Sequence, residues 1–226
     1  MSGYPILLTG LAGRRCVVVG GGAVAARKAQ ALVEAGARPV VIGPALGAEV
    51  EAMAVAGQVE VERRCYRPGD LAGAALAIAA TGDREVNVAV AEEARQRGVL
   101  VNVVDDPALC TFTVPAVVRR GELVIAISTG GQSPALARRL REMLEEIIDP
   151  AYGDLLALLG RLRPRVLNEV PRGRQRQVWD RLLDGELLAT LQREGSGAAE
   201  VRAAEIVGGL IEQGTEGTGG TQELKG

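Results

Sequence analysis

The first half of the chain alternates short apolar runs with segments that have a helical spacing of apolar positions. The predicted strands span residues 15–20, 38–43, 58–64, 75–81 and 99–104, and all but the more polar 58–64 are rich in valine, isoleucine or alanine. The helical stretches between them span residues 23–36, 45–56 and 84–97, and Gly36 is a suitable C-terminal stop for the first. This alternation predicts an α/β domain with a parallel sheet covered by helices on both faces, in the Rossmann manner.

After residue 105 the pattern changes. Residues 111–129 predict two strands joined through Arg120-Gly121, and residues 133–149 predict a helix. The apolar positions of this helix share one face: Leu136, Leu140, Met143, Leu144 and Ile147. Because this segment follows a sheet that already looks complete, we expect it to be a small α+β unit that joins two copies of the chain into a homodimer.

The remainder of the chain, to about residue 194, predicts further helices broken near Pro164 and Pro171, followed by a possible helix over 198–212. The last residues have almost nothing to bury, which is typical of a disordered tail. The expected domains are a Rossmann domain, a dimerisation and substrate-binding unit, a helical region and a tail, over residues 1–110, 111–149, 150–212 and 213–226.

The first strand and helix are joined by a glycine-rich turn, in which Gly20, Gly22 and Ala25 form a GxGxxA signature. Gly20 permits a tight turn, Gly22 lets a pyrophosphate approach the backbone, and Ala25 allows the helix to pack closely on the strand. The phosphates would lie at the helix N-terminus, where unpaired N–H groups and the helix dipole favour an anion. The alternative is that the glycines serve only a βα turn.

One part of this fingerprint is missing. The acidic residue expected at the end of the second strand is replaced by Gly43-Pro44-Ala45, so the adenosine ribose must be held in another way. No arginine follows that strand to take a 2′-phosphate, which favours NAD over NADP. The basic pair Arg27 and Lys28 on the first helix is either a solvated or packing feature or a ligand contact.

The composition excludes several kinds of chemistry. The chain of 226 residues contains no histidine, which excludes Ser-His-Asp, Cys-His and HExxH sites. Its net charge of -2 and aromatic content of 2% disfavour nucleic-acid binding. Apolar runs fall short of the roughly 18 residues of a membrane span, so we expect a cytoplasmic protein. Cys16, Cys65 and Cys110 are too far apart for a CxxC site and are expected to be buried thiols.

Three motifs in order resemble the precorrin-2 dehydrogenase family of sirohaem synthesis, whose members occur alone or fused to a methyltransferase. The motifs are "VVVGGGAVAARKAQALVEAGA", "LAIAATGDREVNVAVAEEARQRGVLVNVVDDP" and "LVIAISTGGQSPALARRLRE". The resemblance covers about residues 4–150, and thinly the helices to 194, and we expect the stand-alone form. It implies NAD-dependent oxidation of precorrin-2 to sirohydrochlorin, dimerisation and, in some members, insertion of ferrous iron. The implied cofactor contacts are Gly22, Ala23, Val24, Pro44 and Ala45, with Thr81 and Asn102 near the same crevice.

The aspartate of the family's "NVVD" motif, proposed to be catalytic, corresponds to Asp105. A carboxylate at this place is suited to its task, because a tetrapyrrole that loses a hydride must also lose a proton. Asp105 directly follows a predicted strand, at the edge where doubly wound folds bind ligands. The alternative is that Asp105 only forms a turn, a role that suits Asp106, before Pro107, better.

The eight carboxylates of precorrin-2 require cations and backbone donors. The turn around Gly130 and Gly131 leads into a helix, with Ser133 as N-cap, and Thr129 would add a hydroxyl. Arginines that could contact the carboxylates are Arg119, Arg120, Arg138, Arg139 and Arg141. Arg138, Arg139 and Arg141 could instead pair with Glu142 and Glu145.

Two questions stay open at this point. Without histidine, iron insertion would depend on carboxylates, thiols, water and the macrocycle nitrogens, so the metal ligands are unknown. The chain could also be a non-enzymatic NAD-binding sensor, which would use the same glycines but would need no carboxylate at the crevice.

Overall fold

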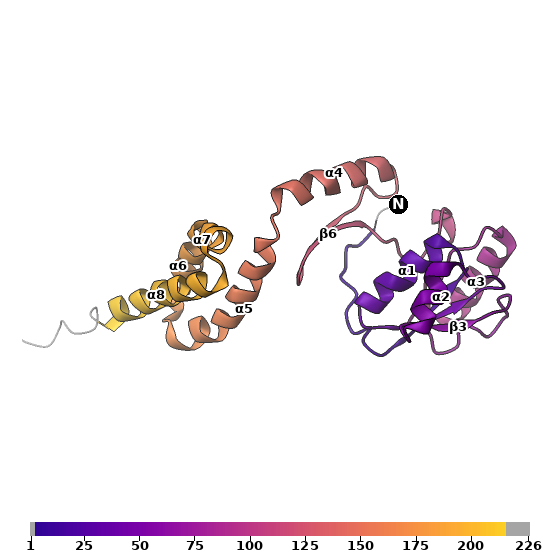
Figure 1. Ribbon diagram of the computed structural model, residues 1–226, viewed down its shortest axis with the longest axis horizontal. Helices are drawn as coiled ribbons and strands as arrows, with labels where there is room; N and C mark the ends of the chain where they lie inside the picture. Colours follow the sequence, from indigo (N-terminus) through magenta and orange to yellow (C-terminus); the bar gives the residue numbers. More distant parts are fainter. Residues whose placement is uncertain (1–2, 216–226) are drawn as a thin grey trace, which may run out of the picture. The chain divides into compact units, whose positions relative to one another are not determined.

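Five parallel strands form one sheet in the N-terminal part of the chain (Figure 1). The computed structural model describes residues 3–215, and the chain divides into two units between Val114 and Pro115. The elements of the first unit are β1 (Arg15–Val19), α1 (Ala23–Glu34), β2 (Arg38–Ile42), α2 (Ala48–Val55), β3 (Glu60–Glu62), β4 (Leu76–Ala79), α3 (Arg84–Arg97), β5 (Leu100–Val103) and a 3-10 turn, η1 (Pro107–Leu109).

The strand order is β3-β2-β1-β4-β5, so the direction of the crossovers reverses between β1 and β4. Alternate residues of each strand face opposite sides of the sheet. Val18 of β1 belongs to the core beneath α1 and α2, whereas Val17 and Val19 belong to the core beneath α3. The predicted Rossmann-type sheet with helices on both faces is therefore confirmed, and its ligand crevice is expected where the order reverses.

The helix ends follow the expected local chemistry. At the C-terminus of α1, Gly36 adopts a φ of +75°, Gly36 N–H donates to the Val33 carbonyl at 2.8 Å, and Ala37 N–H donates to that of Leu32 at 3.0 Å. This is a Schellman motif, in which glycine avoids the strain of a left-handed residue. At the N-terminus of α3, the Asp83 carboxylate accepts hydrogen bonds from the Glu85 and Val86 N–H groups.

Two predicted elements are shorter than their patterns indicated. The predicted strand 58–64 is only Glu60–Glu62, because Gln58 N–H closes the end of α2 by donating to the Met53 carbonyl at 2.9 Å. At the other end, Arg64 N–H bends back to the Glu62 carbonyl at 2.9 Å. The predicted helix 45–56 begins at Ala48, because residues 43–47 form a loop against the glycine turn.

A buried carboxylate anchors the loop that leads into β4. Glu93 of α3 accepts hydrogen bonds from Tyr66 Oη, from Gly69 N–H at 3.0 Å, from Leu71 N–H at 3.2 Å and from Arg97 Nε at 2.6 Å. Burial alone would raise the pKa of Glu93, but these hydrogen bonds outweigh it and hold the pKa below its ordinary value of 4.5.

We expect Glu93→Gln to lower the free energy of unfolding at pH 7 by about 2 kcal/mol, because hydrogen bonds to a charged acceptor are the strongest kind and glutamine cannot accept all four. Since the pKa of folded Glu93 is depressed, its contribution is complete above the ordinary pKa and is lost as the pH falls through the lower, folded value. Urea unfolding should therefore show a wild-type advantage at pH 7 that shrinks below about pH 4.5. A difference independent of pH would show that packing, not charge, is responsible. Exposed Glu92, the neighbouring residue, gives the matched control, Glu92→Gln.

The second unit begins with a two-stranded antiparallel sheet and continues as helices (Figure 1). Its elements are β6 (Ala116–Arg120), β7 (Leu123–Ile127), α4 (Pro134–Ile147), α5 (Ala151–Glu169), α6 (Arg172–Leu182), α7 (Glu186–Glu194) and α8 (Ser196–Thr215). The helices α5 to α8 share one core, to which α5 contributes Leu155, Leu158 and Val166. The predicted hairpin joined at Arg120-Gly121 and the following helix are both present, as is the C-terminal helical region.

Pro164 does not break a helix, contrary to the sequence-based prediction. Helix α5 runs continuously from Ala151 to Glu169 with Pro164 in its interior. Proline removes one backbone donor and crowds the carbonyl four residues earlier, which is that of Gly160. The buried face of α5, with Leu158 before and Val166 after the proline, holds both halves in the same core. Pro171, in contrast, stands directly before α6 and separates it from α5.

The helix α8 extends to Thr215, three residues into the segment predicted as a tail, and the rest of that segment, residues 216–226, lies outside the described residues. Between residues 3 and 215, no helix is both long enough and apolar enough to span a membrane.

Candidate cofactor and active site

The glycine turn after β1 is locked against two neighbouring loops. Gly20 has a φ of +127°, and a Cβ at this position would collide with the carbonyl oxygen of Ala80, which follows β4. Gly21 is equally constrained, because a Cβ there would collide with the carbonyl oxygen of Ala45. The Gly47 N–H also donates to the Gly21 carbonyl at 2.8 Å. The turn therefore depends on glycine at two consecutive positions, of which the sequence signature had marked only Gly20.

Gly22 differs from its two neighbours. A Cβ at Gly22 would meet no atom within 4 Å, and its backbone φ of -82° is open to any residue. Glycine is therefore not required here by the protein's own packing, and the open space lies at the N-terminus of α1. This is the space that a pyrophosphate would occupy.

The N-terminus of α1 is suited to an anion. Gly22 is the N-cap and provides no side-chain cap, and the first turn contains no acidic residue. By contrast, α3 is capped by Asp83 and carries Glu85 in its first turn. The free N–H groups and positive dipole end of α1 therefore fit the phosphates of a dinucleotide. Ala23 and Val24 in this turn are exposed, as are Pro44 and Ala45 after β2.

Thr81 lies at the carboxyl end of β4 and organises the turn into α3. Its hydroxyl accepts from Asp83 N–H at 3.1 Å and lies 2.8 Å from the Asn87 side-chain oxygen, to which it can donate. The Asn87 side chain in turn donates to the Thr81 carbonyl at 3.0 Å. Thr81 thus belongs to the same sheet edge as the glycine turn.

Asn102 lies within β5 rather than beyond its end. Its side-chain amide donates to the Phe112 carbonyl at 3.1 Å and lies 3.6 Å from Cys110 Sγ. The structure therefore gives Asn102 a role in holding the returning loop, and a direct cofactor contact stays a prediction.

Asp105 follows β5 at the same edge of the sheet and is exposed. Its φ is +61°, which makes it the one residue other than glycine with a positive φ among residues 3–215. Aspartate tolerates this left-handed conformation better than most side chains, and such residues cluster at functional sites. Asp106 is half-buried, and its carboxylate lies 3.8 Å from Arg84 Nη2.

The two basic residues on α1 differ in their exposure to solvent. Arg27 is exposed and Lys28 is half-buried. Burial lowers the pKa of Lys28, the charge of Arg27 lowers it further, and Cys110 acts in the opposite direction. A ligand contact by either residue stays a prediction.

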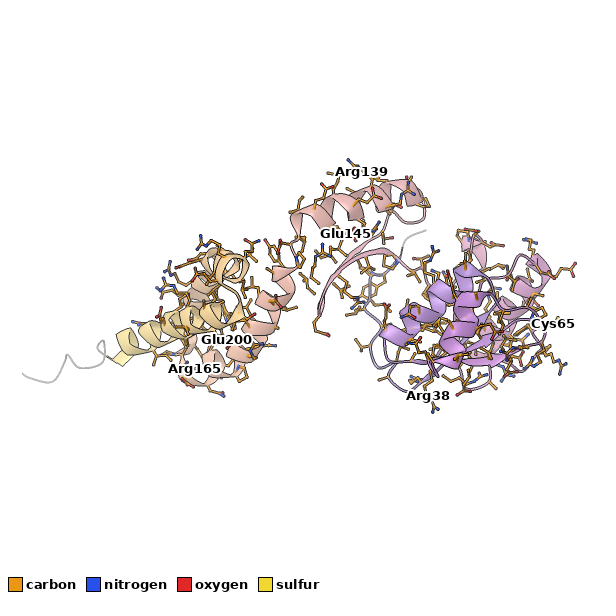
Figure 2. All side chains as sticks on the ribbon, viewed as in Figure 1. Arg38, Cys65, Arg139, Glu145, Arg165 and Glu200 are labelled. Atoms are coloured by element: carbon orange, nitrogen blue, oxygen red, sulfur yellow. The ribbon has the colours of Figure 1, made fainter. Side chains whose placement is uncertain are left out.

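The cysteines only partly match the expectation of buried thiols. Cys16 is buried in β1, Cys110 is half-buried, and Cys65 is exposed in the loop between β3 and β4 (Figure 2). Cys65 lies beyond both the predicted strand 58–64 and the observed strand, which ends at Glu62.

The predicted substrate-binding residues lie in the second unit. As predicted, Ser133 caps α4 by accepting from Leu136 N–H at 3.2 Å, and Pro134 is at the first helical position. Thr129 Oγ1 accepts from Ser133 N–H at 3.2 Å, and Gly130 and Gly131 both have positive φ. These contacts form a rigid turn with backbone N–H groups at the start of a helix.

Some arginines of this unit bond to other groups within it, and others are mainly exposed to solvent. Arg120 donates to the carbonyls of Ile148 at 2.7 Å and Glu145 at 2.8 Å, so it stabilises the C-terminal end of α4. Arg141 pairs with Glu145 at 2.6 Å. Arg138 and Arg139, the latter marked in Figure 2, lie 3.8 and 3.9 Å from Glu142 and are largely exposed. Arg119 is exposed on β6.

Three family models match successive parts of the chain. A putative NAD(P)-binding model covers residues 7–116, a sirohaem biosynthesis protein central model covers 120–147, and a sirohaem synthase dimerisation region model covers 151–206.

Curated relatives and a solved structure agree with these models. The chain is 43% identical over 211 residues to the siroheme synthase of Pseudomonas paraeruginosa and 44% identical over 206 residues to that of Pseudomonas aeruginosa. These alignments cover 92% and 90% of this chain but 45% and 44% of the relatives, so the chain spans about half their length. A solved structure of SirC, a precorrin-2 dehydrogenase, matches with a TM-score of 0.68 and 29% identity, over 93% of this chain and 99% of that one.

The sheet, the glycine turn and the first family model together define an NAD(P)-binding protein of the Rossmann type. The predicted nicotinamide cofactor is confirmed at this level. With the two models that follow, the chain belongs to the family of sirohaem biosynthesis proteins, as its three motifs had indicated.

Proposed function

We propose that this protein oxidises precorrin-2 to sirohydrochlorin in sirohaem biosynthesis, with NAD as the hydride acceptor. The observation that carries the proposal is the exposed, left-handed Asp105 at the carboxyl end of β5, on the same sheet edge as the open N-terminus of α1. A binding module that only senses NAD has no need for a strained carboxylate at that edge. The similarity to the precorrin-2 dehydrogenase SirC supports this choice of substrate.

The reaction removes two electrons and two hydrogens from the tetrapyrrole. NAD, when bound, supplies the acceptor for one hydrogen as hydride. The other hydrogen leaves as a proton, and we propose that the Asp105 carboxylate accepts it. The backbone N–H groups of α1 beyond Gly22 would hold the phosphates, Pro44 and Ala45 would line the adenosine side, and Thr81 would lie toward the reacting end.

The substrate's carboxylates are proposed to bind residues of the second unit. In the turn at Gly130, Gly131 and Ser133, the Gly131 N–H is the proposed donor, because the Gly130 and Ser133 N–H groups already donate to the hydroxyls of Ser128 and Thr129. Exposed Arg119 and Arg138 provide charge. Thr129 and Arg120 contribute mainly by holding this turn and the far end of α4 in shape, because their polar groups already bond to backbone atoms.

We also propose that the protein is a homodimer. Four apolar residues at helical spacing, Leu136, Leu140, Met143 and Ile147, are exposed on α4. Such a stripe on a helix is typical of an interface. The family model for the dimerisation region begins at residue 151, directly after this helix, so the interface is expected to include both α4 and the helices that follow.

Met143→Glu should convert the dimer into monomers at micromolar concentration, because it puts a charge into the middle of this apolar stripe, and burying an unpaired charge costs several kcal/mol. Sedimentation equilibrium measures the change. Val55→Glu, at an exposed apolar position in α2 of the first unit, is the control and should leave the mass unchanged. A wild-type protein that sediments as a monomer would contradict the proposed dimer.

The proposal includes a cytoplasmic location, where the free thiols of Cys16, Cys65 and Cys110 stay reduced. Insertion of ferrous iron stays a prediction from the resemblance. Anaerobic incubation with precorrin-2 and NAD, followed by repetition with ferrous iron, tests both activities in sequence.

A further inference from the structure

Within residues 3–215, β5 is an edge strand of the sheet, and groups of the loop that follows it take the place of a neighbouring strand. Thr111 Oγ1 accepts from Val101 N–H at 2.8 Å, and Thr111 N–H donates to the Val101 carbonyl at 2.8 Å. Two residues further along β5, Cys110 Sγ accepts from Val103 N–H at 3.1 Å. The edge N–H and C=O groups of β5 are therefore satisfied by the loop that returns from its carboxyl end.

Cys110 contacts the backbone on both sides of Asp105. Besides accepting from Val103 N–H, its thiol can donate to the Val103 carbonyl at 3.2 Å or to the Asp106 carbonyl at 3.4 Å. Asp106 N–H reaches the Val103 carbonyl at 3.4 Å. The Cys110 thiol therefore bonds to both ends of the short segment 103–106, which carries Asp105.

These contacts matter because Asp105 has a φ of +61°. A left-handed residue other than glycine costs about 1 kcal/mol or more, and it persists only where the surrounding contacts determine the conformation. The end of this loop is held separately, by Thr111 and by Asn102, whose amide donates to the Phe112 carbonyl. Among residues 3–215, the side-chain hydrogen bonds to the backbone of segment 103–106 come from Cys110, whereas Arg84 approaches only the Asp106 carboxylate, at 3.8 Å.

We propose that Cys110 is a positioning residue, whose thiol holds Asp105 in the conformation that directs its carboxylate toward the substrate. The catalytic part of this inference rests on the proposed function. Serine keeps a donor and an acceptor on a shorter side chain, whereas alanine removes every one of these contacts.

A double-mutant cycle separates positioning from general support of the fold. Cys110→Ala should lower kcat about 10-fold to 100-fold, the range expected from misplacing a catalytic group by a fraction of an ångström to an ångström, with NAD affinity unchanged. Cys110→Ser should recover most of this loss. In the Asp105→Asn background, adding Cys110→Ala should change kcat less than about threefold, because the group to be positioned is already inactive. Cys65→Ala, at the exposed cysteine, is the control and should leave kcat unchanged.

A second readout does not depend on turnover. In the unliganded protein, Cys110→Ala should speed amide hydrogen exchange at Val103 at least about 10-fold and leave Val101, which bonds to Thr111, unchanged. Equal losses of kcat in both Asp105 backgrounds, or unchanged exchange at Val103, would overturn the inference. If the wild type does not oxidise precorrin-2, the proposed function fails and the catalytic part fails with it, while the exchange rates still decide whether Cys110 holds the segment.

Discussion

Gly22→Asp is expected to abolish NAD binding while the protein remains folded. The Cβ of residue 22 points into open space, so the substitution strains no backbone contact. The aspartate would place both bulk and negative charge where the pyrophosphate must approach the N-terminus of α1. Like charges brought together in this way cost several kcal/mol, so the affinity should fall at least about 100-fold.

Isothermal titration calorimetry with NAD measures this loss, and circular dichroism checks the fold. Gly197→Asp, at a position in α8 where a Cβ also meets nothing within 4 Å, is the matched control and should bind NAD like the wild type. The variant Gly21→Ala gives a useful contrast, because its methyl group would collide with the Ala45 carbonyl and disturb the turn itself. A folded Gly22→Asp protein with wild-type affinity would show that the dinucleotide binds elsewhere.

Asp105→Asn is expected to lower kcat about 100-fold to 10,000-fold, the range typical of a lost general base. Asparagine has nearly the same shape and also tolerates the left-handed conformation, so the backbone at φ +61° should persist. NAD affinity should therefore remain near that of the wild type. The loss would fall on the proton transfer alone.

Asp106→Asn is the paired control for this variant. Asp106 contributes backbone contacts to the loop and a distant ion pair to Arg84 at 3.8 Å, both compatible with asparagine. Its kcat should stay within about threefold of the wild type, a difference under 1 kcal/mol in the barrier. If Asp105→Asn oxidised precorrin-2 at the wild-type rate, positioning of the cofactor and substrate would have to provide the catalysis.

The sequence predicted those parts of the fold that depend on local chemistry. The stop of α1 at Gly36 and the bounds of α3, residues 84–97, follow from caps and apolar spacing that are visible in the chain. The expectation that Pro164 breaks a helix was wrong. The packing of α5 against its neighbouring helices outweighs the one hydrogen bond that proline removes. Such packing has no signal in a single sequence.

Some residues of the candidate site could likewise be predicted from the sequence, and others could not. Gly20, Gly22 and Asp105 could be identified from spacing and from their positions after strands. The requirement for glycine at position 21 comes from the carbonyl of Ala45, which is distant in the chain. Cys110 looked like an ordinary buried thiol, because its partners Val103 and Asp106 are backbone groups that any sequence would supply. A β5 edge strand followed by a hydroxyl and a thiol is the signal that could have pointed to it.

The proposed oxidation of precorrin-2 is tested most directly by one anaerobic assay of the wild-type protein with precorrin-2 and NAD. We predict that sirohydrochlorin and NADH form in equal amounts, over many turnovers, because each oxidation transfers one hydride to the cofactor. If the protein binds NAD but produces neither product, the account is contradicted, and the chain is an NAD-binding module without this activity.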